Sequence, residues 1–125
     1  MRRETQALTL SLVDDTYYYI ELKEDVEFDV PDLLDLIEAE KEICNKVLPV
    51  LVICSNTVSA SGDFVRYLAK NENNPLSKAD AFVLKSVAQQ LLAHFYKLFI
   101  TPERPIAFFK KKEDALKWLE QFFDH

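Results

Sequence analysis

The sequence predicts an α/β fold in which a mixed five-stranded sheet is covered by about four helices, in the order β-β-α-β-α-β-α-β-α. Three observations predict this class. The chain opens with two β-type segments, short apolar runs then alternate with helical patterns, and the run at 48–54 is apolar and uncharged. Strands that alternate with helices indicate parallel strands covered by helices, here after an antiparallel start. At 125 residues, the chain is expected to form a single domain over 1–125.

The two opening segments predict a hairpin. Residues 8–13 alternate apolar and polar side chains, which is typical of a half-buried strand. Residues 16–22 are β-branched and aromatic and predict the second strand, with Asp14 and Asp15 as the turn. Because side chains alternate along a strand, the three consecutive tyrosines are expected to point to opposite faces in turn.

A helical pattern follows the hairpin. Asp29 is a suitable N-cap, and Pro31 falls in the first turn, where its missing N–H is tolerated. Apolar residues recur at spacings of three, four and seven, so they form one stripe along the helix. The members of this stripe are Leu33, Leu36, Ile37, Ile43, Cys44 and Val47.

The run at 48–54 is the most apolar in the chain and predicts an interior strand covered on both faces. The polar segment 55–62 comes directly after it. Functional loops of α/β proteins lie at the carboxyl ends of central strands, so this segment is the first place to expect a site. Ser61 is a suitable N-cap for a short helix, which the stretch 71–75 ends.

Residues 77–100 allow two interpretations. The spacing of Ser77 and Asp80 resembles a capping box, which would begin one helix of about 22 residues. The alternative is a strand at 80–85 followed by a helix from Ser86 or Val87. We favour the second interpretation, because it gives each parallel strand its own crossover. A short strand at 106–109 and a last amphipathic helix with an acidic start complete the pattern.

Composition excludes several function classes. The net charge of −6 and the pI near 4.9 disfavour nucleic acid as a partner, since phosphates are repelled unless a local basic patch exists. The basic clusters Arg2–Arg3 and 110–112 are expected to be solvated. Gly62 is the one glycine, which excludes Gly-rich phosphate-binding loops.

The cysteines and histidines do not form a recognisable chemical set. Cys44 and Cys54 do not form a C-x-x-C pair and are expected to be buried thiols. His94 lies within a helical pattern and His125 is the terminal residue, so we expect no zinc site, no cofactor and no enzymatic activity. The chain shows no export signal and no apolar run of the ~20 residues that span a bilayer, and we expect a cytoplasmic protein.

Three features resemble the SpoIIAA-like domains of the STAS superfamily, which includes the anti-sigma-factor antagonists. The first is the whole-chain order of elements. The second is the segment from Val50 to Cys54 through Ser59-Ala60-Ser61-Gly62, which resembles the strand, loop and Ser-Gly helix start of the family. The third is the ending, from Arg104 to Leu119, which resembles the uncharacterised branch of the family.

This resemblance implies a non-enzymatic regulatory or scaffold module that binds another protein through the loop at 55–62. In the anti-sigma antagonists, a partner kinase phosphorylates the Ser before the Gly, which corresponds here to Ser61. A phosphate at a helix N-terminus meets free N–H groups and a favourable dipole. The resemblance therefore implies Asn56, Ser59, Ser61 and Gly62 as candidate switch or partner-binding residues. For Ser61 we favour the simpler interpretation as an ordinary N-cap, because Ser is common at that position.

Two further hypotheses concern the aromatic residues and the surface. SpoIIAA-like domains are grouped with lipid-binding modules of similar sheet architecture, so the alternative function is binding of a small apolar ligand or lipid. Seven phenylalanines fall late in the chain and belong to a core or to such a pocket: Phe82, Phe95, Phe99, Phe108, Phe109, Phe122 and Phe123. An exposed strand edge or the last helix would allow a homodimer.

Overall fold

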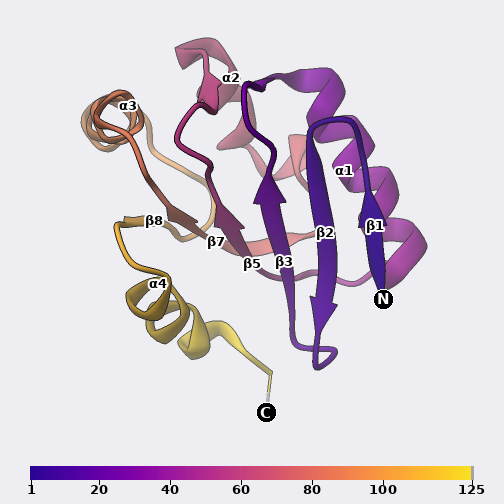
Figure 1. The fold of residues 1–125 in the computed structure, drawn as a ribbon. Helices are drawn as coiled ribbons and strands as arrows, with labels where there is room; N and C mark the ends of the chain where they lie inside the picture. The colour runs from indigo at the N-terminus through magenta and orange to yellow at the C-terminus, as the bar shows by residue number, and fades with distance from the viewer. Residues whose placement is uncertain (125) are drawn as a thin grey trace.

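A computed structural model describes residues 1–124 and confirms an α/β fold with a mixed sheet and four α-helices (Figure 1). The main sheet has the strand order β1-β2-β3-β5-β7-β8. The strands are β1 (Arg2–Glu4), β2 (Leu8–Val13), β3 (Tyr17–Leu22), β4 (Glu27–Phe28), β5 (Leu48–Ile53), β6 (Ser59–Ala60), β7 (Ser77–Val83) and β8 (Ile106–Phe109). The helices are α1 (Val30–Ile43), α2 (Gly62–Leu68), α3 (Val87–Phe99) and α4 (Lys112–Leu119), with short 3₁₀ turns at Asn71–Asn73 and Glu120–Phe122.

The sheet has six strands, one more than the predicted five. The additional strand is β1, which pairs antiparallel with β2 and is short and charged. Its residues carry no apolar alternation, so only the pairing identifies it as a strand. The two-residue strands β4 and β6, which pair with each other in a separate small sheet, were not predicted either. The predicted order otherwise holds: β2 and β3 are antiparallel, and β3, β5, β7 and β8 are mutually parallel.

The predicted hairpin is confirmed together with its turn. Asp14 and Asp15 both have positive φ, at 49° and 53°. A two-residue hairpin turn of type I′ requires positive φ at both central positions, and Asp tolerates this conformation better than most residues. The tyrosines alternate as expected, since Tyr18 is in the core on one face while Tyr17 and Tyr19 pack on the other.

The strand-then-helix interpretation of residues 77–100 is confirmed. β7 ends at Val83, and Ser86 caps α3 by accepting a hydrogen bond from the N–H of Gln89 at 3.1 Å. Gln89 completes a capping box, because its side chain accepts from the N–H of Ser86. Ser77 does not begin a helix; its hydroxyl donates to a carboxylate oxygen of Asp80 inside the sheet.

The first helix begins as predicted. Asp29 caps α1, and Asp32 bonds back to the N–H of Asp29 at 3.0 Å. The predicted stripe is buried at Leu33, Leu36 and Ile37. The far end of the stripe was wrong: α1 ends at Ile43, and Val47 lies beyond it with 52% of its surface exposed.

The helices divide unequally between the two faces of the sheet. The α4 face is covered by α4 alone, and its core consists of Leu51, Ala79, Ala81, Val83, Ala115 and Leu119. The opposite face, called here the cavity face, is covered by α1, α2 and α3 (Figure 1). Within residues 1–124, no helix is long and apolar enough to cross a membrane.

Candidate functional site

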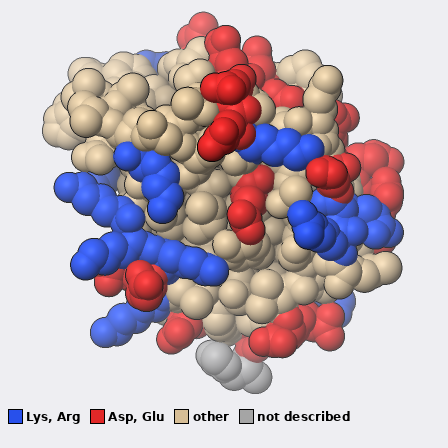
Figure 2. Space-filling model, in the orientation of Figure 1, with Lys and Arg blue, Asp and Glu red and all other residues tan. Residues whose placement is uncertain are grey.

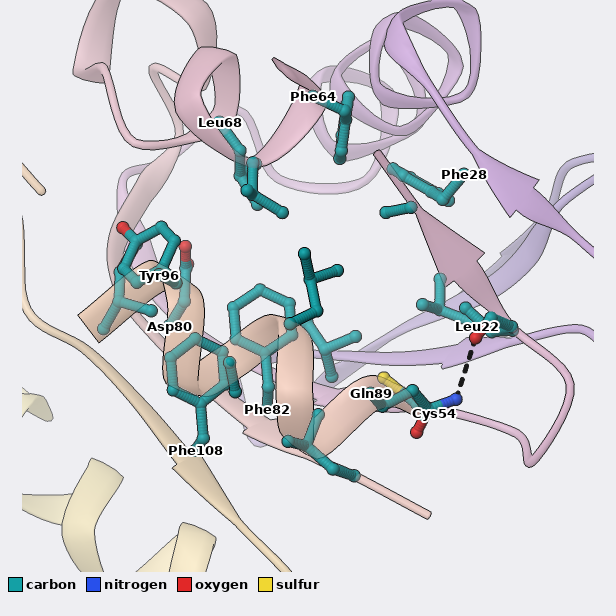
Figure 3. Close-up of a pocket in the computed structure, with 18 of the residues that line it drawn as sticks. Leu22, Phe28, Cys54, Phe64, Leu68, Asp80, Phe82, Gln89, Tyr96 and Phe108 are labelled. Atoms are coloured by element: carbon teal, nitrogen blue, oxygen red, sulfur yellow. Dashed lines mark hydrogen bonds between the residues drawn. The ribbon is translucent and has the colours of Figure 1, made fainter. Parts of the chain in front are cut away.

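A cavity of about 500 Å³ lies between the cavity face of the sheet and helices α1, α2 and α3 (Figure 3). Its floor comes from side chains of β3, β5, β7 and β8, such as Val52 and Phe108. Its roof comes from the buried sides of the helices, such as Phe64 on α2 and Leu92 on α3. A volume of this size is within the range of pockets that bind small molecules.

The walls of the cavity are almost entirely apolar. Phe82 and Phe108 stack on neighbouring strands with their ring centroids 5.6 Å apart, and Tyr96 of α3 meets the edge of Phe108 at 5.5 Å. Phe82 lies on the interior strand β7 and Leu84 directly follows that strand, and both are nevertheless only half-buried. This arrangement leaves apolar surface available to a ligand.

Gln89 closes one end of the cavity. Its amide N–H groups donate to the carbonyl oxygens of Ser55 at 2.7 Å and Val58 at 2.9 Å. Its carbonyl oxygen accepts from the N–H of Lys85 at 2.8 Å. One buried side chain therefore ties the loop after β5 to the start of α3, and Figure 3 shows it at the same end as Cys54 and Leu22.

The other end carries polar groups from three elements. Asp80 of β7 forms a buried ion pair with Arg104, whose Nη2 and Nε lie 2.6 and 3.1 Å from one carboxylate oxygen. Glu40 of α1 and Tyr96 of α3 are 1% and 4% exposed. The Oε1 atom of Glu40 and the hydroxyl of Tyr96 have no hydrogen-bond partner among the described residues.

Burial changes the protonation of these groups. It raises the pKa of Glu40 to about 8, with a further increase from the negative charge of Asp80 and a smaller opposing effect from Arg104. Glu40 is therefore mainly an uncharged acid at pH 7. Burial also raises the pKa of Tyr96 to about 12 and that of Cys54 to about 11, so the phenol and the thiol keep their protons.

The four residues implied by the resemblance do not form one cluster. Asn56 is exposed in the turn after β5, and Ser59 is at the rim of the cavity in β6. Ser61 is exposed and caps α2 by accepting from the N–H of Phe64 at 3.0 Å, which confirms its predicted capping role. A side chain at Gly62 would meet the ring of Phe95 at 3.6 Å, an ordinary contact distance.

The segment 23–27 also holds the loop at 55–58 and the short strand that follows it. Besides Gln89, the carbonyl of Lys23 accepts from the hydroxyl of Ser55 at 3.2 Å, and the N–H of Asp25 donates to the hydroxyl of Thr57 at 2.7 Å. Ser59 pairs with Glu27 between β6 and β4. The loop therefore forms a fixed wall beside the cavity.

Sequence reasoning missed the polar end of the cavity. Glu40 lies four residues after Leu36, so helical spacing places it on the buried stripe, and a carboxyl group there was the available signal. Arg104 carried no such signal, since it lies between Pro102 and Pro105 and is recognised only through its contact with Asp80.

Of the remaining candidates within the described residues, Cys54 borders the cavity and the others do not line it. The basic residues 110–112 are exposed, as expected. Both cysteines are free thiols; Cys54 is buried as predicted, whereas Cys44 is only half-buried, so the prediction for it was wrong. His94 is exposed on α3, and the prediction for His125 concerns a residue outside the described part. Within residues 1–124, no three His, Cys, Asp or Glu side chains are grouped closely enough to hold a metal ion.

Comparison with known proteins identifies the family of the chain. The family described as "Domain of unknown function (DUF7793)" matches residues 12–123. The chain belongs to this DUF7793 family. No curated protein gives a significant match.

A solved structure shows the same fold as this DUF7793 domain. It is an uncharacterised protein of the DUF3478 family with a SpoIIAA-like fold, from Shewanella loihica PV-4. The two chains are 17% identical, the TM-score is 0.59, and the match covers 95% of this chain and 98% of the other. The similarity to a SpoIIAA-like fold confirms the predicted architecture, and at this level of identity it concerns the fold alone.

Proposed function

We propose that this DUF7793 domain is a non-enzymatic module that binds a small apolar molecule in the cavity between the sheet and helices α1–α3. The observation that supports this proposal is the cavity itself, with about 500 Å³ and almost wholly apolar walls. A ligand that enters it removes its own apolar surface and that of half-buried side chains such as Phe82 from water, which stabilises the complex by roughly 25 cal/mol per Å².

The chemistry of the wall supports binding in preference to catalysis. The Cys54 thiol borders the cavity, but its raised pKa of about 11 keeps it protonated and therefore a weak nucleophile. The amide of Gln89 is engaged with backbone groups, and Asp80 is engaged with Arg104. These groups build the cavity and leave it as a binding surface.

The test is titration with an uncharged apolar dye, N-phenyl-1-naphthylamine, whose fluorescence rises in apolar surroundings. Val52 lies on the floor of the cavity, so Val52→Phe should fill part of it. We expect the dye to bind the variant roughly tenfold or more weakly, because overpacking costs about 1–3 kcal/mol.

The matched control uses the next residue of the same strand. Ile53 faces the other side of the sheet, where it packs against the α4 face, so Ile53→Phe should leave the affinity for the dye unchanged. Circular dichroism would establish that both variants are folded. Absence of dye binding to the unmodified protein, or equal loss in both variants, would contradict the proposed function.

A protein-interaction role is the second candidate, and an exposed face of α3 favours it. Four apolar residues of this helix have 63–73% of their surface exposed: Val87, Leu91, Leu98 and Phe99. Figure 2 shows tan, uncharged surface over α3, with basic side chains gathered below it over β8 and α4. The ring of Phe95 on this helix lies beside Gly62 at the start of α2, and Gly62 follows Ser61 in the chain.

The two capping variants Ser61→Asp and Ser61→Asn would test that role. Both residues cap helices well, so stability should be retained while only Asp adds a charge. If Ser61 is a switch, affinity chromatography should recover different partner proteins with the two variants. Identical sets of partners would contradict a charge-dependent switch at this position.

A further inference from the structure

At the polar end of the cavity, the ion pair of Asp80 and Arg104 has its hydrogen-bond partners within the protein, whereas two other residues each have a polar atom without a partner among the described residues. Asp80 accepts from Arg104 through one oxygen and from the hydroxyl of Ser77 through the other. Arg104 also donates to the carbonyl of Leu68 at 3.0 Å and to the side-chain oxygen of Asn71 at 3.3 Å. This ion pair is satisfied by the protein and does not require a ligand.

The two residues that lack a hydrogen-bond partner are Glu40 and Tyr96. Each is more than nine-tenths buried and borders the cavity, and each has a polar atom without a partner among the described residues. Leaving a buried polar atom without a hydrogen bond costs about 1–3 kcal/mol. A ligand that supplies the missing hydrogen bonds would recover this free energy, so this end of the cavity favours a ligand with a polar group.

The charges around Glu40 define which kind of polar group fits. Burial is the main cause of the raised pKa of Glu40, and the Asp80 carboxylate raises it further, so this end of the cavity disfavours a second negative charge. An anion would lie near the Asp80 carboxylate, and a cation would be balanced only if Glu40 gave up its proton at a buried position that disfavours the carboxylate. Either charge is therefore unfavourable here. The protonated carboxyl and the phenol each offer an O–H donor and an oxygen acceptor, which matches a hydroxyl or carbonyl group.

We propose that the cavity binds an uncharged amphiphile, with an apolar body against Phe82 and Phe108 and a single hydroxyl or carbonyl oxygen at the end that holds Glu40 and Tyr96. Figure 3 shows the arrangement of the walls on which this orientation is based: Tyr96 and Asp80 lie together at one end, and apolar side chains extend from them toward Cys54 and Leu22. The inference rests on the proposed function and adds the class of ligand.

The experiment compares three ligands that differ only in the head group: decanol, decanoic acid and decylamine. Each is titrated as a competitor of N-phenyl-1-naphthylamine bound to the full chain at pH 7, where decanoic acid is an anion and decylamine a cation. We expect decanol to bind at least roughly tenfold more tightly than either charged ligand, because one additional hydrogen bond or one avoided buried charge is worth about 1–3 kcal/mol.

Substitutions at the polar end sharpen the test. Tyr96→Phe and Glu40→Leu should each weaken decanol binding by roughly three- to tenfold while leaving the affinity for the dye nearly unchanged. Glu40→Gln keeps a donor, an acceptor and the uncharged state, so it should retain most of the decanol affinity. Thermal unfolding of each variant shows whether it remains folded.

The outcomes separate the two proposals. If neither the dye nor any ligand binds, the proposed function fails. If the dye binds but a charged ligand binds as tightly as decanol, the inferred ligand class fails and the cavity remains a binding site. Loss of decanol affinity in Glu40→Gln equal to that in Glu40→Leu would also overturn the inferred role of the carboxyl group.

Discussion

The two faces of the central sheet are formed by the same strands, but one face is closely packed and the other leaves a cavity. On the α4 face, Leu51 and Ala81 of the sheet and Leu119 of the single short helix α4 are completely buried. On the cavity face, three helices cover the sheet and still leave a cavity of about 500 Å³. The number of covering helices therefore does not decide how completely a face is filled.

The size of the side chains on β7 explains part of the difference. Ala79 and Ala81 point toward α4, and these small residues let the helix approach the sheet closely. Phe82 points the other way and stacks on Phe108, which in turn meets Tyr96 of α3. These aromatic rings hold α3 away from the sheet, so the space between them remains available to a ligand.

Aromatic residues pack closely on the α4 face, whereas on the cavity face they border the open space. Tyr17 stacks on Phe123 with ring centroids 5.4 Å apart, and Trp118 contacts both Phe109 and Phe122. Dense packing of this kind is what gives protein interiors their stability. The comparison suggests that the α4 face supplies stability, and that the cavity face depends on a few polar contacts to keep its shape.

The largest expected effect concerns one of those contacts. Arg104→Ala would leave the Asp80 carboxylate buried without a partner, which should lower the free energy of unfolding by about 3–5 kcal/mol. Lys78→Ala is the matched control, because Lys78 lies on β7, the strand that carries Asp80, and pairs with the exposed Asp124 at 3.0 Å. Removing an exposed pair costs about 1 kcal/mol or less.

Urea unfolding of the two variants measures this difference directly. A loss in Arg104→Ala no greater than that in Lys78→Ala would show that the cavity face does not depend on its ion pair. The comparison would then rest on side-chain volume alone.

A slightly smaller effect tests side-chain volume. Leu119→Ala, on the α4 face, removes a fully buried side chain from a packed layer and should cost about 2–5 kcal/mol. Leu92→Ala, on α3, removes a half-buried side chain that already borders the cavity, and should cost about 1 kcal/mol or less because fewer contacts are lost. Equal losses in thermal or urea unfolding would contradict the contrast between the two faces.

The order of elements could be predicted from the sequence because it depends on local patterns. Alternation predicted the hairpin, and helical spacing with capping residues predicted α1, α2 and α3. The β1 strand was missed because three charged or polar residues carry no such pattern, and only the backbone of β2 orders them.

The candidate site was predicted only in part, because it depends on distances between elements. The loop after β5 was expected to carry the site, and it does form one wall of the cavity through Val58 and Ser59. Glu40, Asp80 and Arg104 belong to three separate segments, and nothing in their local sequence shows that they approach one another. Whether Asn56, Ser61 or Gly62 binds a partner stays a prediction.

The effect that is smallest over a single pH unit is a pH dependence that belongs to the cavity face. The pKa of Glu40 is raised from 4.5 to about 8 on folding, so the native state holds a proton that the unfolded state releases within this range. The groups around it are Asp80 and Arg104, with Tyr18 on β3 also nearby. The contribution of this group to stability should be fully present below pH 4.5, and should fall by up to about 1.4 kcal/mol per pH unit as pH rises from there toward 8.

Glu40→Gln isolates this contribution, because glutamine cannot release a proton. Wild type and variant should have similar free energies of unfolding near pH 5, and the variant should become the more stable of the two as pH approaches 8. Urea unfolding at several pH values measures the difference, in which the titration of all other groups cancels. Parallel pH profiles would mean that Glu40 is ionised in the native state, and the cavity face would then hold a buried negative charge at the end assigned to an uncharged head group.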